Sequence, residues 1–233
     1  MLGPSSLDHR LIRRIIKQKK HNNFVKLHNR GKIKWNDKSL SALKQEIRLA
    51  LRSQQEGRCI YCRRIVKIER RNAYEAIEHF LDKSKTHYLK WSFSCVNLSL
   101  SCHPCNIEKS TRDMGDASVQ VSPCYTSTAG EYKWLHPYFD DYHSNIEIKE
   151  GWVYKVKPNA PQRTRAFNLI TECKLDQICS IEAHSEKFLN SLNRLTLLMG
   201  KALEKGQIER CRRLQQISLK LQHDFNPLGM PVT

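Results

Sequence analysis

Two Cys-x-x-Cys pairs, forty positions apart, constrain this chain more than any other feature of its sequence. Cys59 and Cys62 form the first pair, and Cys102 and Cys105 form the second. Two residues between cysteines let both thiolates of a tight turn reach one ion, and four thiolates complete the tetrahedron that Zn²⁺ prefers. A closed shell of thiolates leaves no position for water, so we expect the zinc to be structural. The alternative is four reduced cysteines that bind no metal.

The cellular compartment decides how such cysteines are used. No run approaches the ~18 apolar residues of a membrane span, and the N-terminus lacks the apolar segment of a signal peptide. We therefore expect a cytoplasmic protein without membrane contact, whose thiols stay reduced. The five other cysteines form no such pairs and are expected to be core or incidental residues: Cys95, Cys124, Cys173, Cys179 and Cys211.

The charge balance points to a polyanionic partner. The 233 residues carry a formal net charge of +17, with 40 Lys and Arg against 23 Asp and Glu. An excess of this size attracts polyanions, of which nucleic acid is the commonest. A basic soluble protein without such a partner is the alternative. Hydrophobic residues make up 39% of the chain, which is enough for a core and argues against wholesale disorder.

Much of this charge lies in residues 1–36, which we interpret as a basic helical N-terminal segment. Leucine and isoleucine recur at helical spacing between Leu11 and Ile16 and predict an amphipathic helix in its first half. A basic helix can lie on phosphates, a membrane surface or an acidic partner, or it can be a solvated helix packed on the core. The basic residues are Arg10, Arg13, Arg14, Lys17, Lys19, Lys20, Lys26, Arg30, Lys32 and Lys34.

The rest of the sequence predicts short strands and helices. Apolar spacing predicts a helix over 39–55, with Ser39 as its cap and Gly57 as its stop. The later apolar stripe, interrupted at Gly206, predicts two long helices whose apolar residues are expected to be core. The other predicted elements are strands at 74–77 and 96–100, a helix that begins near residue 102, a loop over 114–130, and a hairpin from 146–148 and 152–156.

The insertion between the cysteine pairs carries residues suited to phosphodiester cleavage. That reaction needs a base to take a proton from water, a divalent ion to stabilise charge at phosphorus, and ligands for the ion. A hairpin that places His79 opposite a helix near Asn106 could supply all three. Glu78 projects to the other face of the strand from His79, so a ligand and a base need not compete. The sequence shows no set of aromatic residues suited to stacking on bases, so it does not predict which nucleotide sequence the protein would recognise.

The order of these residues resembles the HNH, or ββα-metal, nucleases. The resemblance covers about residues 55–112 and rests on CxxC, Ile77-Glu78-His79-Phe80, Asn97-Leu98, and then CxxCN-x-x-K. In that family a hairpin carries the general base and a following helix carries a metal ligand. The resemblance therefore implies roles for five residues. His79 is the base, Asn97 orders the hairpin and the base, Asn106 takes the place of the last His, Lys109 is the lysine after the final Cys-Asn, and Glu78 ligates the metal.

Two departures from the family pattern affect the expected metal. Glu78 stands where the family often has Asp, and Asn106 supplies a neutral oxygen in place of an imidazole. An oxygen-rich shell favours Mg²⁺ or Mn²⁺ over Zn²⁺ at the catalytic site. The resemblance implies a nuclease acting on DNA or RNA, with DNA favoured because most HNH relatives cut it.

A narrower resemblance concerns one HNH subgroup. This subgroup contains the nuclease subunits of Septu-type and retron-linked anti-phage systems. The chain resembles it in the run Ile77-Glu78-His79-Phe80 and in the later His136-Pro137 and Asp140-Asp141. Those subunits work beside an ATPase partner, so the resemblance implies an effector role in antiviral defence. His136, Asp140 and Asp141 either shape the site or cap a turn, and we favour the turn.

The fold predicted from these observations is α+β: a small ββα-metal module with a four-cysteine zinc knuckle, flanked by N-terminal and C-terminal helices. We expect the nuclease module at 37–140 and a hairpin with a helical region at 141–233. Two rivals remain. One is a zinc-ribbon protein that binds nucleic acid without cutting it, and the other is a subunit that docks its helical tail on a partner.

Overall fold

A computed structural model describes residues 2–69 and 72–223, and the chain divides into two compact units. Unit 1 comprises residues 1–147 and 154–175, and unit 2 comprises 148–153 and 176–233. Helices and small two-stranded sheets occur together, so the α+β class is confirmed. Within the described residues, no helix has both the length and the apolar character needed to cross a membrane.

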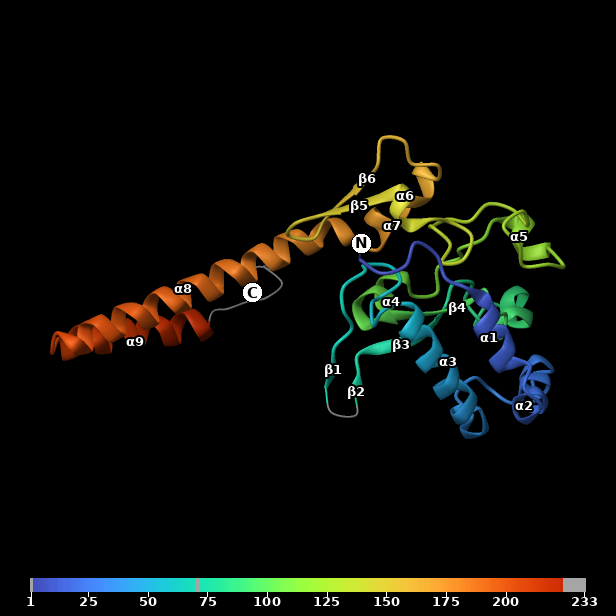
Figure 1. Cartoon of the computed structure of the whole chain (residues 1–233), viewed down its shortest axis with the longest axis horizontal. Coiled ribbons are helices and arrows are strands. Elements are labelled where there is room, and N and C mark those ends of the chain that lie inside the picture. Colours follow the sequence, from blue (N-terminus) through green and yellow to red (C-terminus); the bar gives the residue numbers. More distant parts are fainter. Residues whose placement is uncertain (1, 70–71, 224–233) are drawn as a thin grey trace. The chain divides into compact units, whose positions relative to one another are not determined.

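The basic N-terminal segment contains two helices where one was predicted, α1 (His9–Ile16) and α2 (Lys19–Asn29). Asp8 caps α1 by accepting a hydrogen bond from the Arg10 backbone N–H. The chain turns after Ile16, so the apolar stripe ends within two helical turns. Ile12 and Ile15 are buried on the side that packs against α3 (Figure 1).

The predicted helix over 39–55 is a 3-10 turn, η1 (Lys38–Leu40), followed by α3 (Ser41–Gln54). The prediction of Ser39 as the cap is wrong, because Asp37 accepts the hydrogen bond and the Ser39 N–H donates it. Gly57 is confirmed as the stop. It adopts a φ of +67°, and its N–H donates to the Arg52 carbonyl at 2.9 Å.

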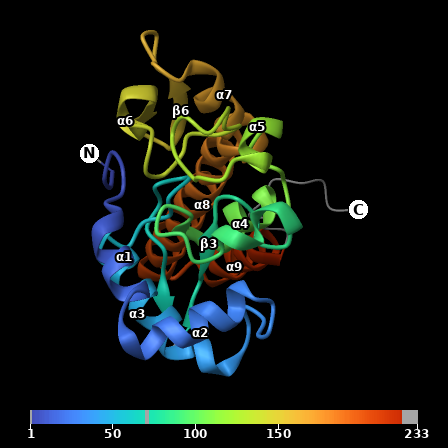
Figure 2. The same cartoon turned by 90° about the vertical axis from the view of Figure 1, so that its right-hand side faces the viewer.

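A hairpin and a helix follow in the order β3 (Glu75–His79), β4 (Leu98–Cys102) and α4 (His103–Lys109). The strands are antiparallel, with Glu75 opposite Cys102 and His79 opposite Leu98. Both strands start one or two residues later than predicted. α4 packs against both strands, and α3 packs against β4, as Figures 1 and 2 show for this part of unit 1. The loop between the strands contains η2 (Thr86–Trp91).

The remaining elements of the chain are short, apart from the last two helices. Residues 114–130, predicted as a loop, contain the helix α5 (Ala117–Val121), which Asp116 caps through the Val119 N–H. The predicted hairpin over 146–156 is present, and its turn holds Gly151 at a φ of +72°. The other elements are β1 (Ile68–Glu69), β2 (Asn72–Ala73), α6 (Tyr142–Asn145), β5 (Ile146–Lys149), β6 (Val153–Val156), α7 (Arg163–Glu172) and η3 (Leu175–Gln177).

Unit 2 is mainly a helical hairpin of α8 (Ile178–Glu204) and α9 (Ile208–His223), which pack against each other. Gly206 separates them at a φ of +66°, as predicted. The prediction that their apolar stripe is core holds at Ile178, which is buried, but not along the rest of the stripe that the structure describes. α9 has no buried residue among those described, and Leu203, Ile208 and Ile217 are more than half exposed. Two helices alone cannot cover both sides of such a stripe.

The side chain of Gln55 joins the end of α3 to β4. It is fully buried, accepts from the Leu100 N–H at 2.7 Å, and donates to the Leu100 carbonyl at 2.8 Å. Its amide also donates to the Arg58 carbonyl at 2.8 Å. A two-stranded hairpin is marginally stable by itself. The Gln55 side chain therefore forms hydrogen bonds with the Leu100 backbone of the kind that a third strand would form.

We expect Gln55→Ala to lower the free energy of unfolding by about 1–3 kcal/mol, since it leaves the N–H of Leu100 without a partner, whereas the Leu100 carbonyl keeps the Ile60 N–H. Ser53→Ala, at an exposed position of the same helix, should stay within about 0.5 kcal/mol of the parent. Urea unfolding followed by tryptophan fluorescence measures both. Equal stabilities for the two variants would contradict this role.

Candidate active-site cavity and four-cysteine metal site

The four cysteines of the two CxxC pairs come together in one cluster. Their Sγ atoms all lie within 4.8 Å of one another, and Cys62 and Cys102 are 3.8 Å apart. Metal–sulfur bonds of ~2.3 Å in a tetrahedron place sulfur atoms at about this separation. All four are free thiols, and three are buried. The cluster could therefore bind a metal such as zinc, as the spacing predicted.

The backbone around the cluster fixes the knuckle to the hairpin. The Ile60 N–H donates to the Leu100 carbonyl on β4 at 2.9 Å, and the Cys59 N–H donates to the Arg64 carbonyl at 3.0 Å. Cys102 ends β4, and Cys105 lies in the first turn of α4. Burial opposes ionisation of Cys59, but hydrogen bonds from neighbouring thiols hold its pKa well below the usual value. One thiol is thus already disposed to ionise, as a metal ligand must.

A cavity of about 1030 Å³ opens beside the hairpin and contains most of the predicted catalytic residues. Its walls come from the start of α3, from β3 and the loop after it, and from the end of α4. Glu78, His79, Asn106 and Lys109 all line it. These four residues therefore border one cavity, although strand alternation predicted that Glu78 and His79 project to opposite faces of β3. Asn97 does not line this cavity.

His79 ends β3 and is 3% exposed. Its Nε2 atom is buried and has no hydrogen-bond partner among the described residues. Burial lowers the pKa of His79 well below its usual value, and the charges of Lys83 and Lys109 lower it further. The ring is therefore neutral near pH 7, with one nitrogen uncommitted. A neutral imidazole of this kind can accept a proton.

Glu78 and Lys109 form a buried ion pair in the same wall. The Lys109 Nζ lies 2.5 Å from the Glu78 Oε1, and it donates to the His79 carbonyl at 2.9 Å. The Tyr61 hydroxyl approaches the same oxygen of Glu78 at 3.5 Å. Burial raises the pKa of Glu78, although the charge of Lys109 opposes the shift. Lys109 thus fixes the end of β3 against α4.

The expected catalytic metal site is only partly assembled. Glu78 and Asn106 share the cavity wall, but Lys109 occupies one oxygen of Glu78. In the described part of the chain, the cysteine cluster is the only group of three or more His, Cys, Asp or Glu side chains close enough to share an ion. Asp82, which no signal in the sequence indicated, adds a third carboxylate to the lining beside Glu75 and Glu78, and it accepts hydrogen bonds from Ser84.

Asn97, which the resemblance assigns to ordering the hairpin and the base, bonds to the loop that follows His79. Its Oδ1 accepts from the Leu81 N–H at 2.7 Å, and its Nδ2 donates to the Leu81 carbonyl at 3.0 Å. The same Nδ2 donates to the Trp91 carbonyl at 3.1 Å. The side chain thereby holds both ends of the loop between β3 and β4. Asn97 acts on the backbone beside His79 and does not touch the imidazole.

The segment after α5 reinforces Asn97 through two buried rings. The Tyr125 hydroxyl lies 2.8 Å from the His136 Nε2 and 3.3 Å from the Asn97 Oδ1. The His136 Nδ1 accepts from the Tyr138 N–H at 3.2 Å, so its Nε2 carries the proton and donates to Tyr125. The Tyr125 hydroxyl is then left to donate to Asn97. No signal in the sequence indicated Tyr125.

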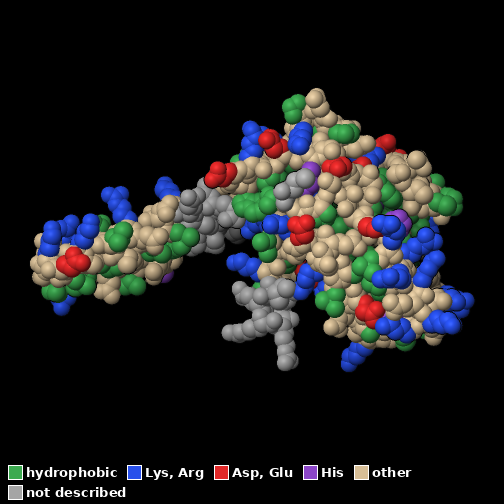
Figure 3. All heavy atoms as spheres, in the orientation of Figure 1, with side chains coloured by type: hydrophobic (Ala, Val, Ile, Leu, Met, Phe, Trp, Pro, Cys, Tyr) green, Lys and Arg blue, Asp and Glu red, His purple; other side chains and the backbone are tan. Residues whose placement is uncertain are grey.

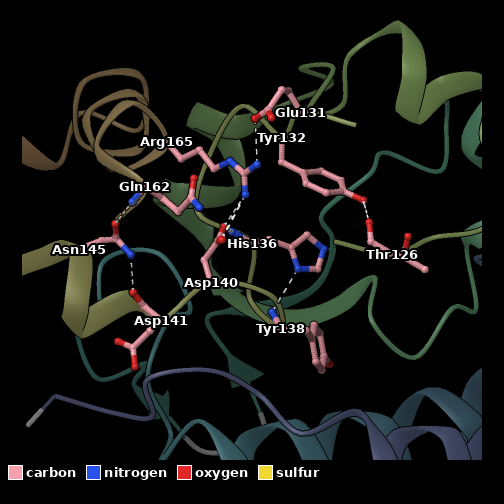
Figure 4. Close-up of polar contacts among 10 residues, drawn as sticks. All are labelled: Thr126, Glu131, Tyr132, His136, Tyr138, Asp140, Asp141, Asn145, Gln162 and Arg165. Carbon is pink, nitrogen blue, oxygen red and sulfur yellow. Dashed lines mark hydrogen bonds and ion pairs between the residues drawn. The ribbon is translucent and has the colours of Figure 1, made fainter. Parts of the chain in front are cut away.

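The two aspartates after His136 cap turns, which was the favoured interpretation. Asp140 accepts from the His136 N–H at 2.7 Å, and Asp141 accepts from the Ser144 N–H at 2.7 Å. Figure 4 shows Arg165 between Asp140 and Glu131, with ion-pair distances of 3.1 and 2.9 Å. None of these side chains lines the large cavity. They support the fold around the site.

A basic surface, formed by the ten Lys and Arg residues from Arg10 to Lys34, covers the N-terminal helices. All ten are exposed, and Figure 3 shows Lys and Arg side chains gathered over α1 and α2. Arg10 pairs with Asp8, and Lys20 pairs with Glu46. Among the described residues, the other eight have no ion pair. Their charge is therefore available to an external anion.

The chain matches no protein family, no curated protein and no solved structure with which it was compared.

We expect about one tightly bound zinc per chain. Structural zinc can contribute ~10 kcal/mol or more to the folding of small modules, so Cys105→Ser should lower both the zinc content and the melting temperature. Cys124→Ser, at an exposed cysteine outside the cluster, is the matched control and should change neither. Elemental analysis and thermal unfolding with and without a chelator provide the measurements. Folded protein without zinc would rule out the metal.

Proposed function

We propose that this protein is a metal-dependent nuclease that hydrolyses phosphodiester bonds, with His79 as the general base. The observation that carries the proposal is that His79 lines a cavity with cations and oxygen ligands while its buried Nε2 has no hydrogen-bond partner among the described residues. A general base must be uncharged at the working pH and must reach the proton that it removes. The lowered pKa of His79 meets the first requirement, and the proposal requires the Nε2 to become accessible from the cavity when substrate binds.

The charges of the cavity suit a phosphate. Four cations line it, and two of them are used within the protein: Lys109 pairs with Glu78, and Arg48 lies 3.5 Å from Glu75. Lys44 and Lys83 have no ion pair among the described residues. Positive groups at the mouth of a low-dielectric cavity attract a phosphodiester and stabilise the charge that develops on it during hydrolysis.

Oxygen atoms in the lining would be the ligands of a divalent ion. Lys109 and Tyr61 both contact Oε1 of Glu78, which leaves Oε2 for another ligand. Asn106 and Asp82 supply further oxygen atoms, and such ligands favour Mg²⁺ or Mn²⁺. When bound, the ion would polarise the phosphate and stabilise the leaving oxygen. The protein's own part is to orient His79 through Lys109 and Asn97 and to hold the phosphate between lysines.

The resemblance to HNH nucleases adds to this proposal but is independent of the geometry. It implies Glu78 and Asn106 as ligands of the catalytic ion, and DNA as the favoured substrate with RNA as the alternative. An effector role in anti-phage defence and an ATPase partner rest on the resemblance alone, so both stay predictions. The rival is a zinc-knuckle protein that binds nucleic acid or a partner without cutting. It leaves the uncommitted nitrogen of His79 unexplained.

His79→Ala should lower the cleavage rate by ~10²–10⁴-fold, because a positioned general base contributes about this factor. His79→Asn keeps most of the side-chain volume and should be equally inactive, so a packing defect can be separated from loss of the base. His103→Ala, at an exposed histidine of α4, is the control and should cut normally. Labelled duplex DNA, single-stranded DNA and RNA with Mg²⁺ or Mn²⁺ serve as substrates. Full activity of both His79 variants would exclude this base.

The basic surface should set affinity and leave turnover unchanged. Each phosphate contact contributes ~0.9 to the slope of log K against log salt on duplex DNA. The test variant replaces four exposed cations of α1 and α2 with Gln: Arg13, Arg14, Lys17 and Lys19. The control makes the same charge change in unit 2: Lys201, Lys205, Arg210 and Arg213.

Binding titrations from low to moderate salt measure both slopes. We expect a flatter slope and weaker low-salt binding for the first variant, and a smaller effect for the control. Equal slopes in the parent and the α1–α2 variant would show that these helices do not contact the phosphates.

A further inference from the structure

The indole of Trp35 stands at the boundary between the active-site cavity and a second, smaller cavity. The second cavity has a volume of about 440 Å³, within the roughly 300–1,000 Å³ of small-ligand sites. Trp35, Lys83 and Ser84 line both cavities. His28, Ile33 and Leu89 give the second cavity a largely apolar wall, in contrast to the charged wall around His79.

Contacts with two other rings hold Trp35 in place, and its side chain stays partly accessible to solvent. Its ring centroid lies 4.3 Å from that of His79 in an edge contact and 5.0 Å from that of Phe93. The side chain is half-buried, so part of the indole still faces solvent. Two cations flank it, with the ammonium groups of Lys44 and Lys83 at 5.7 and 5.9 Å from the ring centroid. A rigid aromatic ring beside free cations is the arrangement that binds single-stranded nucleic acid.

We propose that the second cavity binds an unpaired nucleobase of the substrate, stacked against Trp35, while the adjoining phosphate lies beside His79. This inference rests on the proposed nuclease function, because the base that it places belongs to the strand being cut. Neighbouring nucleotides would lie on the two sides of the indole, with Lys83 shared between them. The substrate class that follows is single-stranded or locally unpaired nucleic acid.

The composition of the second cavity favours a base over a peptide or a lipid chain. The apolar residues Ile33 and Leu89 match the flat faces of a base, and the adjacent lysines match its phosphate. His28 also lines this cavity, and its buried Nδ1 has no hydrogen-bond partner among the described residues. A base inside a duplex is stacked on both faces and cannot enter such a cavity without leaving the helix.

The test measures binding with cleavage removed. Fluorescence anisotropy gives the Kd of a twelve-nucleotide thymidine strand, an abasic strand of equal length and charge, and a thymidine–adenine duplex. All proteins carry His79→Asn, so no strand is cut. The variants are Trp35→Leu, Trp35→Phe and, as a control tryptophan outside both cavities, Trp152→Leu.

Stacking of one base contributes ~1–3 kcal/mol, which is about a 5- to 100-fold change in Kd. Trp35→Leu should therefore weaken thymidine-strand binding by about this factor and leave abasic-strand and duplex binding unchanged. Trp35→Phe should retain most of the affinity, and Trp152→Leu should retain all of it. Equal losses on the thymidine and abasic strands, or no loss on either, would overturn the base subsite.

The result is separable from that of the cleavage assay. If the wild-type protein cuts nucleic acid and the Trp35 variants bind both strands alike, the nuclease proposal stands and the base subsite falls. If nothing is cut but Trp35→Leu weakens only thymidine-strand binding, the base subsite stands and the nuclease proposal falls.

Discussion

The ammonium group of Lys109 is the interaction on which the candidate site depends. It lies in the protein interior between the carboxylate of Glu78 and the backbone carbonyl of His79, so one charge joins α4 to the last two residues of β3. Desolvating such a pair is costly, and the attraction repays the cost only when the geometry is good and further hydrogen bonds are made. Removing either partner would strand a charge in the core. The position of His79 therefore depends on the ion pair between Lys109 and Glu78 and on the hydrogen bond from Lys109 to the His79 carbonyl.

The cysteine cluster also connects α4 to the hairpin, in this case through β4. Cys102 ends β4, Cys105 begins α4, and the turn with Cys59 and Cys62 bonds to β4 through the Ile60 N–H. A metal at this point would join strand, helix and turn into one unit. The hairpin has only two strands, and a hairpin of that size is marginal in water. Side chains such as Gln55 and Lys109 therefore supply contacts that further strands would otherwise give, and a metal bound by the cysteines would add to them.

Support for the site also comes from a segment far along the chain. Tyr125 and His136 lie in an aromatic cluster, where His136 hydrogen bonds to the Tyr125 hydroxyl and that hydroxyl donates to Asn97. Asn97 in turn fixes the backbone two residues beyond His79. A hydrogen bond in a low-dielectric interior is strong, and an unpaired buried group is costly. The loop beside His79 therefore has little freedom to move. General-base chemistry requires such constraint, since a small displacement of the base lowers the rate steeply.

The sequence by itself determined the cysteine cluster and four residues that line the cavity, Glu78, His79, Asn106 and Lys109. Cys-x-x-Cys spacing predicts a metal site because only local turn geometry is needed to bring two thiols together. The order of His79, Asn97 and Asn106 predicted a hairpin and a helix around one site. Gly57 could be predicted because a helix stop needs a residue that tolerates positive φ. Each of these inferences depends on short-range stereochemistry, which the residue types record directly.

Only the tertiary structure decided which distant side chains complete the site. Trp35 and Tyr125 show no local pattern, because their roles come from packing against residues far away in sequence. The sequence likewise did not predict that several apolar residues of α8 and α9 are exposed. Apolar periodicity shows that a helix has a face to bury and does not show whether the chain provides enough surface to cover it. Long-range contacts are set by the whole fold, so no single stretch of sequence encodes them.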